Sequence, residues 1–188
     1  DNFGEFVSIS SDGKRIAVGA HQHDNSKGEV RVFEWDGTSW NQLGSPMDGA
    51  SDSDEFSYRG VHISGDGNTI AAASFKGGYV DIYRWSGTSW VKTGNILITN
   101  SSGDDPGQLS LSYSGNRVAI GYHTVNENND KGKLKIFDWN GTSWVQYAAI
   151  DGKNNGDELG SSVSISRDGK NLAVGANGAG IVRVYDVS

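Results

Sequence analysis

One pattern occurs four times along this chain, and no other feature constrains the fold as strongly. In each copy, apolar residues alternate with polar ones, a tight turn follows, and a second apolar stretch comes after it. The copies begin at Val7, Val61, Leu109 and Val163, so successive starts are separated by 54, 48 and 54 residues. A tandem repeat of this length predicts an architecture in which each copy is one supersecondary unit that buries its apolar surface against its neighbours.

Each repeat is predicted to hold four short strands. The alternation around Val7 and Ile9 is typical of a β-strand, and the Asp12-Gly13 pair favours a two-residue type I′ turn into the second strand. The third strand, at 28–35 in the first repeat, carries apolar residues on both faces. The fourth begins at the second tryptophan of a Trp-x-Gly-Thr-Ser-Trp hexapeptide. All six tryptophans lie in three copies of that hexapeptide, at 35–40, 85–90 and 139–144.

These repeats predict an all-β protein, a β-propeller of four-stranded antiparallel blades. Four strands in about 50 residues, repeated in tandem, are typical of propeller blades. A parallel α/β fold is excluded because no segment places apolar residues at a period of 3.6. The expected repeats are 1–54, 55–102, 103–156 and 157–188, in a single propeller domain whose last blade lacks its outer strand.

Two parts of the chain resemble FG-GAP repeats, the blades of integrin-α-like propellers. One is Phe3-Gly4-x-x-Val7-Ser-Ile-Ser followed by Ile16-Ala-Val-Gly-Ala20, and the other is 159–166 followed by 172–176. The Ser-x-Asp-Gly hairpin is also similar to WD40-like blades. The resemblance implies a ligand surface on one rim, a role in protein binding or cell adhesion, and an extracellular, cell-surface or otherwise exported location. It does not imply the calcium loop of integrin blades, because residues 10–14 lack the further carboxylates of that loop.

The first and last residues fall at unequal places in the repeat. Asp1 aligns with Asp157, inside a connection between blades, and Ser188 falls where a fourth strand would begin. Because an uncovered edge strand invites aggregation, we expect these blades to be part of a larger propeller, completed within a longer repeat protein or by another chain.

Composition narrows the classes of partner. The chain has 16 Lys and Arg against 23 Asp and Glu, a net charge of −7, which argues against nucleic acid and anionic lipid because both need a basic surface. It has no cysteine, which excludes disulfides, thiolate metal sites and a cysteine nucleophile. No apolar run approaches the roughly 20 residues that a membrane-spanning helix needs.

The long, variable connections fall on one face of the predicted blades, and the tight turns fall on the other. Variable loops on a fixed scaffold are where function usually lies. We therefore predict a protein-interaction or structural module that binds a protein partner or a larger assembly through this loop face. The candidate contact residues are His21, His23, Asp24, Asp52, Asp54, Asp104, Asp105, Asn126, Asn128, Asp130 and Asp157.

Acidic clusters recur at equivalent places in these loops. We expect no required cofactor, and the candidate cation is Ca²⁺, which prefers six to eight oxygen ligands in flexible loops. Its candidate ligands are Asp48, Asp52, Asp54, Asp151 and Asp157. The His21-x-His23-Asp24 segment also has the ligand types of a transition-metal site, although a plain surface role is the simpler interpretation. His62 and His123 are expected to be structural.

The repeated tryptophans suggest an alternative function. Trp40, Trp90 and Trp144 are candidates for stacking on sugar rings in a glycan-binding propeller, while packing between blades is the simpler interpretation. A carbohydrate-active enzyme ranks third. We expect no enzymatic activity, because the sequence holds no nucleophile elbow, no phosphate-binding glycine loop and no HExxH motif.

Overall fold

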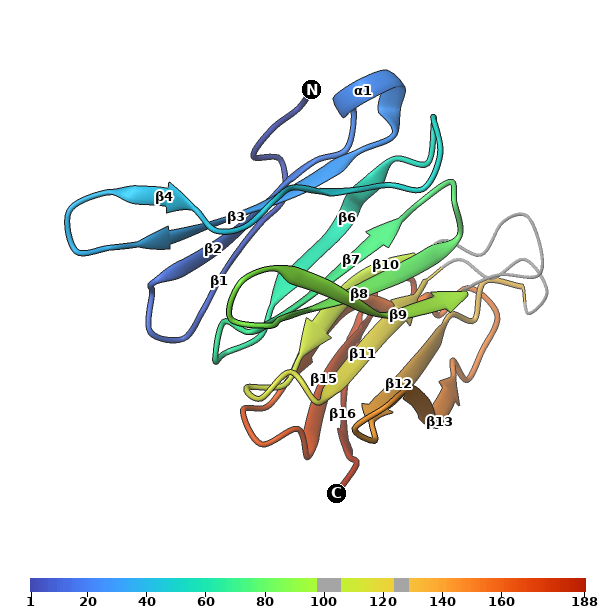
Figure 1. The fold of residues 1–188 in the computed structure, drawn as a ribbon. Coiled ribbons are helices and arrows are strands. Elements are labelled where there is room, and N and C mark those ends of the chain that lie inside the picture. Colours follow the sequence, from blue (N-terminus) through green and yellow to red (C-terminus); the bar gives the residue numbers. More distant parts are fainter. Residues whose placement is uncertain (98–105, 124–128) are drawn as a thin grey trace.

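The computed structural model describes residues 1–97, 106–123 and 129–188, and in these residues four antiparallel sheets follow one another along the chain (Figure 1). Each sheet corresponds to one predicted repeat and is called a blade below. Blade 1 has the strand order β1-β2-β3-β4, with β5 also paired to β3, and blades 2 and 3 are β6-β7-β8-β9 and β10-β11-β12-β13. Blade 4 is β14-β15-β16. The all-β prediction is confirmed, and so is the three-stranded last sheet.

The strand bounds agree closely with the repeat pattern. In blade 1 they are β1 (Val7–Ile9), β2 (Arg15–Ala20), β3 (Glu29–Trp35), β4 (Trp40–Gln42) and β5 (Met47–Asp48). In blade 2 they are β6 (Phe56–Ile63), β7 (Thr69–Ser74), β8 (Tyr79–Trp85) and β9 (Trp90–Leu97). Blade 3 consists of β10 (Pro106–Leu111), β11 (Arg117–Tyr122), β12 (Lys133–Trp139) and β13 (Trp144–Asp151). Blade 4 consists of β14 (Leu159–Ile165), β15 (Asn171–Ala176) and β16 (Ile181–Asp186).

In residues 1–97, 106–123 and 129–188 the helical content is one short turn, α1 (His23–Ser26), in the loop between β2 and β3. Asp24 and Asn25 inside it have left-handed backbone angles, with φ of 45° and 55°, so it is a compact loop rather than a regular helix. In the described part of the chain, no helix has the length and apolar character needed to cross a membrane.

The predicted two-residue turn between the first two strands is wrong. Ser10 pairs with Arg15 through its backbone N–H, so the connection has four residues, and the N–H of Gly13 donates to the carbonyl of Ser10 at 2.9 Å. Gly13 has a φ of 71°, but Asp12 does not have the positive φ that a type I′ turn requires. The reason is local: the Asp12 carboxylate accepts from the Ser10 hydroxyl at 2.6 Å and from the Lys14 N–H at 3.0 Å.

The apolar core is divided into three clusters, one between each pair of successive blades. In the first, Val30 and Val32 of blade 1 pack with Val61 and Ile63 of blade 2. The second joins blades 2 and 3, and the third joins blades 3 and 4. A blade therefore has two apolar faces, which explains why its third strand is apolar on both sides. Burying each such side chain contributes roughly 1.5–3 kcal/mol.

Candidate functional site

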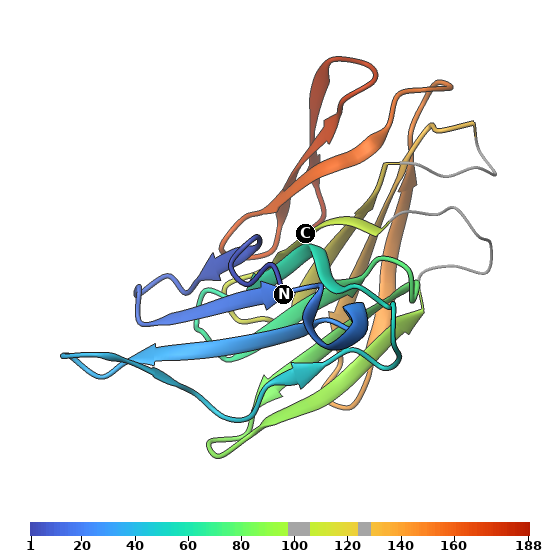
Figure 2. The ribbon, with the colours of Figure 1, turned by 90° about the horizontal axis from the view of Figure 1, so that it is seen from above.

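The four inner strands β1, β6, β10 and β14 meet around a common axis, from which the blades fan out in an arc that is open between blade 1 and blade 4 (Figure 2). The beginnings of these strands and the ends of the second strands lie on the predicted loop face. Three of the inner strands start with a register shift against their partners, in β6, β10 and β14. Such bulges re-aim side chains, and they are common beside functional sites.

The bulge in blade 2 contains one more residue than the equivalent segments of blades 1 and 4. Phe56 to Val61 spans five positions, whereas Phe3 to Val7 and Leu159 to Val163 each span four. The extra length is accommodated by left-handed backbone at Ser57 and Arg59, with φ of 74° and 64°. Non-glycine residues rarely adopt this conformation, which costs of order 1–3 kcal/mol and clusters at functional sites.

A hollow of about 550 Å³ lies on the axis at this end of the arc, and all four blades line it. We call it the axial hollow. Its lining combines carboxylates, a guanidinium group, amides, hydroxyls and aromatic rings. The residues are Glu5 and Phe6 from blade 1, Tyr58 and Arg59 from blade 2, Gln108 and His123 from blade 3, and Glu158, Ser161, Ser162 and Asn177 from blade 4.

Aromatic rings form one wall of the axial hollow. The Tyr58 ring lies edge-on to Phe6, with 6.1 Å between centroids, and to Phe75 at 5.4 Å. The Arg59 guanidinium lies over both Tyr58 and Phe75, at 5.4 and 5.3 Å from their centroids. One of its nitrogens is 3.5 Å from Nε2 of His123. The bulge of blade 2 therefore places a guanidinium group in the wall of the hollow, where it lies over two ring faces.

The predicted loop-face residue that joins this cluster is His21. Its imidazole is 5% exposed, lies 4.7 Å from the Tyr58 ring centroid, and has Nδ1 3.4 Å from the Glu5 carboxylate. His23 is more exposed and lies apart, with its ring nitrogens 3.8 Å from Asp1 and 3.9 Å from Glu29. The two histidines therefore do not converge as a metal site. Asp24 lies in α1, and Asp52 is exposed in the loop before β6.

Five further predicted contact residues lie at or beyond the ends of the described segments. Asp130 is half-buried at the start of the third described segment, and Asp104, Asp105, Asn126 and Asn128 lie outside the described residues.

The candidate calcium ligands all lie in the described residues. Among the described residues, which include Asp48, Asp52 and Asp151, no three His, Cys, Asp or Glu side chains come together as a metal would require. Asp54 instead accepts from the backbone N–H groups of Ala50 and Ser51 and from the Tyr79 hydroxyl. The Asp54 carboxylate therefore binds the backbone of its own loop.

In blade 4, the Asp157 carboxylate likewise binds the backbone of its own loop. Its carboxylate accepts from the Lys153 and Asn154 N–H groups, at 3.2 and 3.1 Å, and from the Arg183 guanidinium at 2.9 Å. The Asn154 N–H and the Arg183 guanidinium hold the pKa of Asp157 below its usual value. This aspartate is a structural cap of the loop rather than an open ligand.

The tryptophan pairs are found where the hexapeptides predict them. Ring centroids of Trp35 and Trp40, of Trp85 and Trp90, and of Trp139 and Trp144 are 5.6, 5.2 and 5.7 Å apart. Trp90 is used for packing, because its indole N–H donates to the carbonyl of Leu43 in blade 1 at 2.8 Å. Trp40 is 41% exposed, so its predicted sugar-stacking role stays a prediction.

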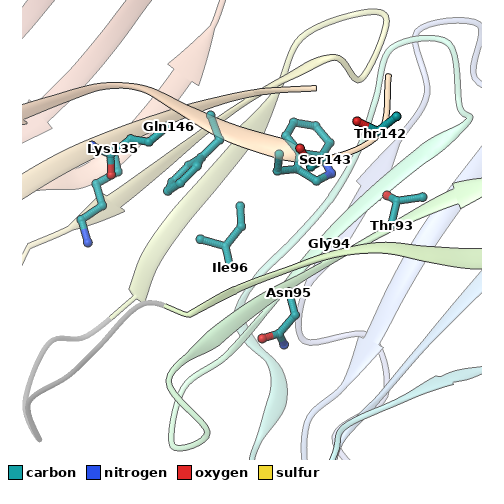
Figure 3. A pocket seen from close by; sticks show the side chains of 10 residues that line it. Thr93, Gly94, Asn95, Ile96, Lys135, Thr142, Ser143 and Gln146 are labelled. Atoms are coloured by element: carbon teal, nitrogen blue, oxygen red, sulfur yellow. The ribbon is translucent and has the colours of Figure 1, made fainter. Parts of the chain in front are cut away.

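Trp144 borders a second hollow of about 450 Å³, between β9 and the β12–β13 hairpin. Figure 3 shows Thr93 and Ile96 of β9 on one side of it and Ser143 of the hairpin on the other. The Trp144 indole nitrogen is buried and has no hydrogen-bond partner among the described residues. We call this space the interblade pocket.

The axial hollow lies on the predicted loop face, but none of its ten lining residues is among the predicted contact residues. Tyr58, Arg59 and Gln108 come from the starts of inner strands, which the repeat pattern treats as interchangeable. The signal that could have found them is the change in spacing, five positions in blade 2 against four in blades 1 and 4.

Comparisons with known proteins bear on the fold. No model of a known protein family matches the chain, and no curated protein sequence matches it. Solved structures do match. A Bacteroides fragilis protein provisionally assigned as a 6-phosphogluconolactonase has a TM-score of 0.67 at 12% identity, over 98% of this chain and 50% of its own.

Two further solved structures match nearly the whole chain. A chain of the Mitotic Checkpoint Complex has a TM-score of 0.65 at 14% identity, over 97% of this chain and 50% of its own. Sqt1 from Chaetomium thermophilum has a TM-score of 0.64 at 16% identity, over 96% and 42%. The fold is that of a β-propeller. This chain spans about half the length of the propellers it matches, and at these identities the likeness shows the fold alone; the narrower FG-GAP assignment stays a prediction.

Proposed function

We propose that this propeller is a non-enzymatic protein-interaction module that seats a basic segment of a protein partner in the axial hollow. The observation that carries the proposal is that one hollow is lined by side chains of all four blades, a tyrosine and an arginine among them. Tyrosine and arginine are enriched among the residues that dominate binding energy at protein interfaces. One matched structure, a chain of the Mitotic Checkpoint Complex, belongs to a protein assembly, which supports a role in protein partnering.

Charge favours a basic partner. Two carboxylates, Glu5 and Glu158, line the hollow against one guanidinium, that of Arg59. Asp1, Asp52 and Asp151 add exposed carboxylates in the connections of the predicted loop face. The chain as a whole carries a net charge of −7. An acidic face attracts cationic segments and accelerates their association, and this attraction weakens as salt is added.

Fluorescence anisotropy with labelled peptides tests the proposal. The probe is a 12-residue peptide of alternating Lys, Arg and Ser, and the comparison is the same peptide with Glu at every basic position. Binding of the basic peptide at 50 mM NaCl should weaken about tenfold or more at 300 mM NaCl, because the contacts are ionic. The acidic peptide should not bind.

A matched pair of double variants locates the contact. Glu5→Gln with Glu158→Gln removes two carboxylates from the axial hollow, and we expect about a tenfold loss of affinity or more. Glu34→Gln with Asp186→Asn removes two carboxylates from the opposite ends of β3 and β16 and should change affinity less than about twofold. Equal losses in the two double variants, or equal binding of both peptides, would contradict the proposal.

Glycan binding is the second candidate, and the interblade pocket favours it. Its lining of Thr93, Asn95, Ser143 and Gln146 around the Trp144 ring offers hydroxyl and amide groups beside an aromatic wall, and the indole N–H lacks a partner within the described residues. Titration with neutral hexasaccharides of glucose, mannose and N-acetylglucosamine should change tryptophan fluorescence. The change should be lost in Trp144→Phe and kept in Trp90→Phe; the absence of any change in the unaltered protein would exclude this function for these sugars.

A further inference from the structure

A second hollow on the axis lies at the end opposite to the axial hollow, where the inner strands run into the tight turns. Its volume is about 260 Å³, and residues of all four blades line it. We call it the turn-face hollow. Ile63, Leu111 and Ile165 are the last residues of β6, β10 and β14, and they give it apolar walls. A hollow of this size suits a ligand smaller than those that fill ordinary binding pockets.

One position of the repeat contributes a residue of every blade to this hollow. It follows the serine that begins each tight turn, and it is occupied by Ser11, Gly65, Tyr113 and Arg167. Backbone bonds join this position from blade to blade, since the Ser11 N–H donates to the Gly65 carbonyl at 2.9 Å and the Tyr113 N–H to the Arg167 carbonyl at 3.1 Å. The side chain therefore varies on a backbone that repeats, which is where binding residues are usually found.

The two large side chains at this position stack on each other. The guanidinium carbon of Arg167 lies over the Tyr113 ring, 3.8 Å from its centroid. The ring has this place because position 65 is glycine, where a Cβ would lie 2.3 Å from Cδ2 of Tyr113. A ring face attracts a guanidinium group and orients it, and the N–H donors at its edge remain available to a ligand.

The Arg167 guanidinium has no anionic partner among the residues that the structure describes, where its contact is the Tyr113 ring. The adjacent Asp168 is bound within its own turn, because it accepts from the Ser166 hydroxyl at 2.6 Å and from the Lys170 N–H at 3.1 Å. These two donors hold the pKa of Asp168 below its usual value. In a chain with a net charge of −7, an unpaired guanidinium beside apolar walls favours an anionic ligand.

We propose that the turn-face hollow binds a carboxylate attached to a short apolar group. Arg167 pairs with the carboxylate, whose planar shape matches the fork of guanidinium donors. Ile63, Leu111 and Ile165 bury the apolar group. Two sources share this chemistry, the apolar C-terminal residue of a peptide and a free short-chain carboxylic acid. The inference goes beyond the proposed function, whose hollow lies at the other end of the axis and takes a cationic segment.

Two-dimensional ¹H–¹⁵N NMR of the 188-residue chain at pH 7 tests the proposal, with hexanoate as the probe. Hexanoate should shift the Arg167 Nε–H signal and the Leu111 amide signal, with a dissociation constant of about 1 mM or lower. Hexan-1-ol has the same apolar group without the charge and should bind about tenfold more weakly or less. The absence of shifts at about 20 mM hexanoate, or equal binding of the alcohol, would overturn the proposal.

A matched pair of variants locates the contact, and the Leu111 amide signal reports binding in both. Arg167→Gln removes the guanidinium group from the hollow and should raise the dissociation constant of hexanoate about tenfold or more. Lys170→Gln removes a cation of the same turn that does not line the hollow, and should change the constant less than about twofold. Both side chains are exposed, so neither variant should impair folding. Equal losses in the two variants would overturn the proposal.

The dipeptide acetyl-glycyl-leucine, with its C-terminal carboxylate free or amidated, separates the two sources. Tighter binding of the free dipeptide than of hexanoate would support the proposal with a chain terminus as the ligand. Binding of hexanoate without binding of the dipeptide would support it with a free acid. The amidated dipeptide should not bind, and equal binding of the two dipeptides would overturn the proposal because recognition would not depend on the carboxylate.

Discussion

The indole nitrogen of Trp90 in blade 2 donates a 2.8 Å hydrogen bond to the carbonyl oxygen of Leu43 in blade 1. This bond joins the first residue of β9 in blade 2 to the residue that follows β4 in blade 1. The neighbouring Gly44 makes the contact close, because a Cβ there would lie 3.0 Å from both Trp85 and Trp90. Trp90 therefore fixes blade 2 against blade 1.

Replacing Trp90 by Phe should lower the free energy of unfolding by about 1–2 kcal/mol. The change removes the donor to the Leu43 carbonyl and part of a half-buried ring. Urea denaturation of the two proteins measures the difference. The equivalent Trp40→Phe should cost less than about 0.5 kcal/mol, because Trp40 is 41% exposed. Equal losses at the two positions would show that the bond between blades contributes nothing.

Gly28→Ala should destabilise the protein by more than about 3 kcal/mol. Gly28 has a φ of +84°, and a Cβ there would lie 2.3 Å from the Phe56 carbonyl oxygen of the next blade. The cost combines left-handed backbone, roughly 1–2 kcal/mol, with a clash against backbone that has little room to move.

Gly156→Ala is the matched control for the clash. Its φ is +73°, but a Cβ would have no described atom within 4 Å, so only the backbone cost of about 1–2 kcal/mol is expected. Thermal or urea unfolding of both variants gives the comparison. If Gly156→Ala costs as much as Gly28→Ala, the close approach of blades 1 and 2 is not what requires glycine.

His62 should make the protein less stable in mild acid. Burial lowers the pKa of His62 below its usual 6.5, and its Nδ1 accepts the Leu111 N–H at 3.3 Å, as a neutral ring can. The unfolded chain therefore takes up a proton at a higher pH than the folded protein does. The stabilising contribution is complete above about pH 6.5 and is lost progressively as the pH falls below that value.

Urea unfolding at pH 7.5 and pH 5.5 tests this sign. His62→Gln keeps an acceptor for the Leu111 N–H but cannot titrate, so it should lose less stability between the two pH values than the unaltered protein does. An identical decrease in both proteins would assign the pH dependence to other groups.

Arg117→Lys should cost about 1–3 kcal/mol although it conserves charge. The guanidinium of Arg117 makes two bonds to Asp138, at 2.6 and 2.7 Å, and one to the Gly169 carbonyl of blade 4 at 2.8 Å. A lysine ammonium cannot make this planar, forked set of contacts. In a double-mutant cycle with Asp138→Asn, measured by urea denaturation, the two substitutions should be non-additive. Additive losses would show that the pair is not coupled.

The local part of the fold could be predicted from the sequence. Strand β4 begins at Trp40, β9 at Trp90 and β13 at Trp144, as the hexapeptides indicate. Apolar alternation, turn residues and tryptophan pairs act over a few residues, so they are visible in one repeat and are reinforced by comparing repeats. The type I′ prediction failed because side-chain bonds to Asp12 outweighed the usual preference of an Asp-Gly pair.

For the candidate site, the sequence could predict only the face of the blades on which loops gather, and not the residues that line the axial hollow. The recurring carboxylates suggested calcium, but Asp54 and Asp157 bind the backbone of their own loops. The residues that do converge, Arg59 and His123 among them, come from different blades and are 64 positions apart in the chain. No local sequence pattern predicts this contact. The two residues are brought together by the curvature of the arc and by the bulges in the inner strands.

The sequence by itself determined the four-stranded blade, its repetition and the apolar character of both its faces, since these follow from short-range periodicity. Only the tertiary structure decided which of those faces are covered. Val61 is buried because blade 1 lies against it, whereas the equivalent Val7 is 66% exposed because no described residue does so. The two valines occupy the same place in the repeat, and their environments differ only through packing between blades.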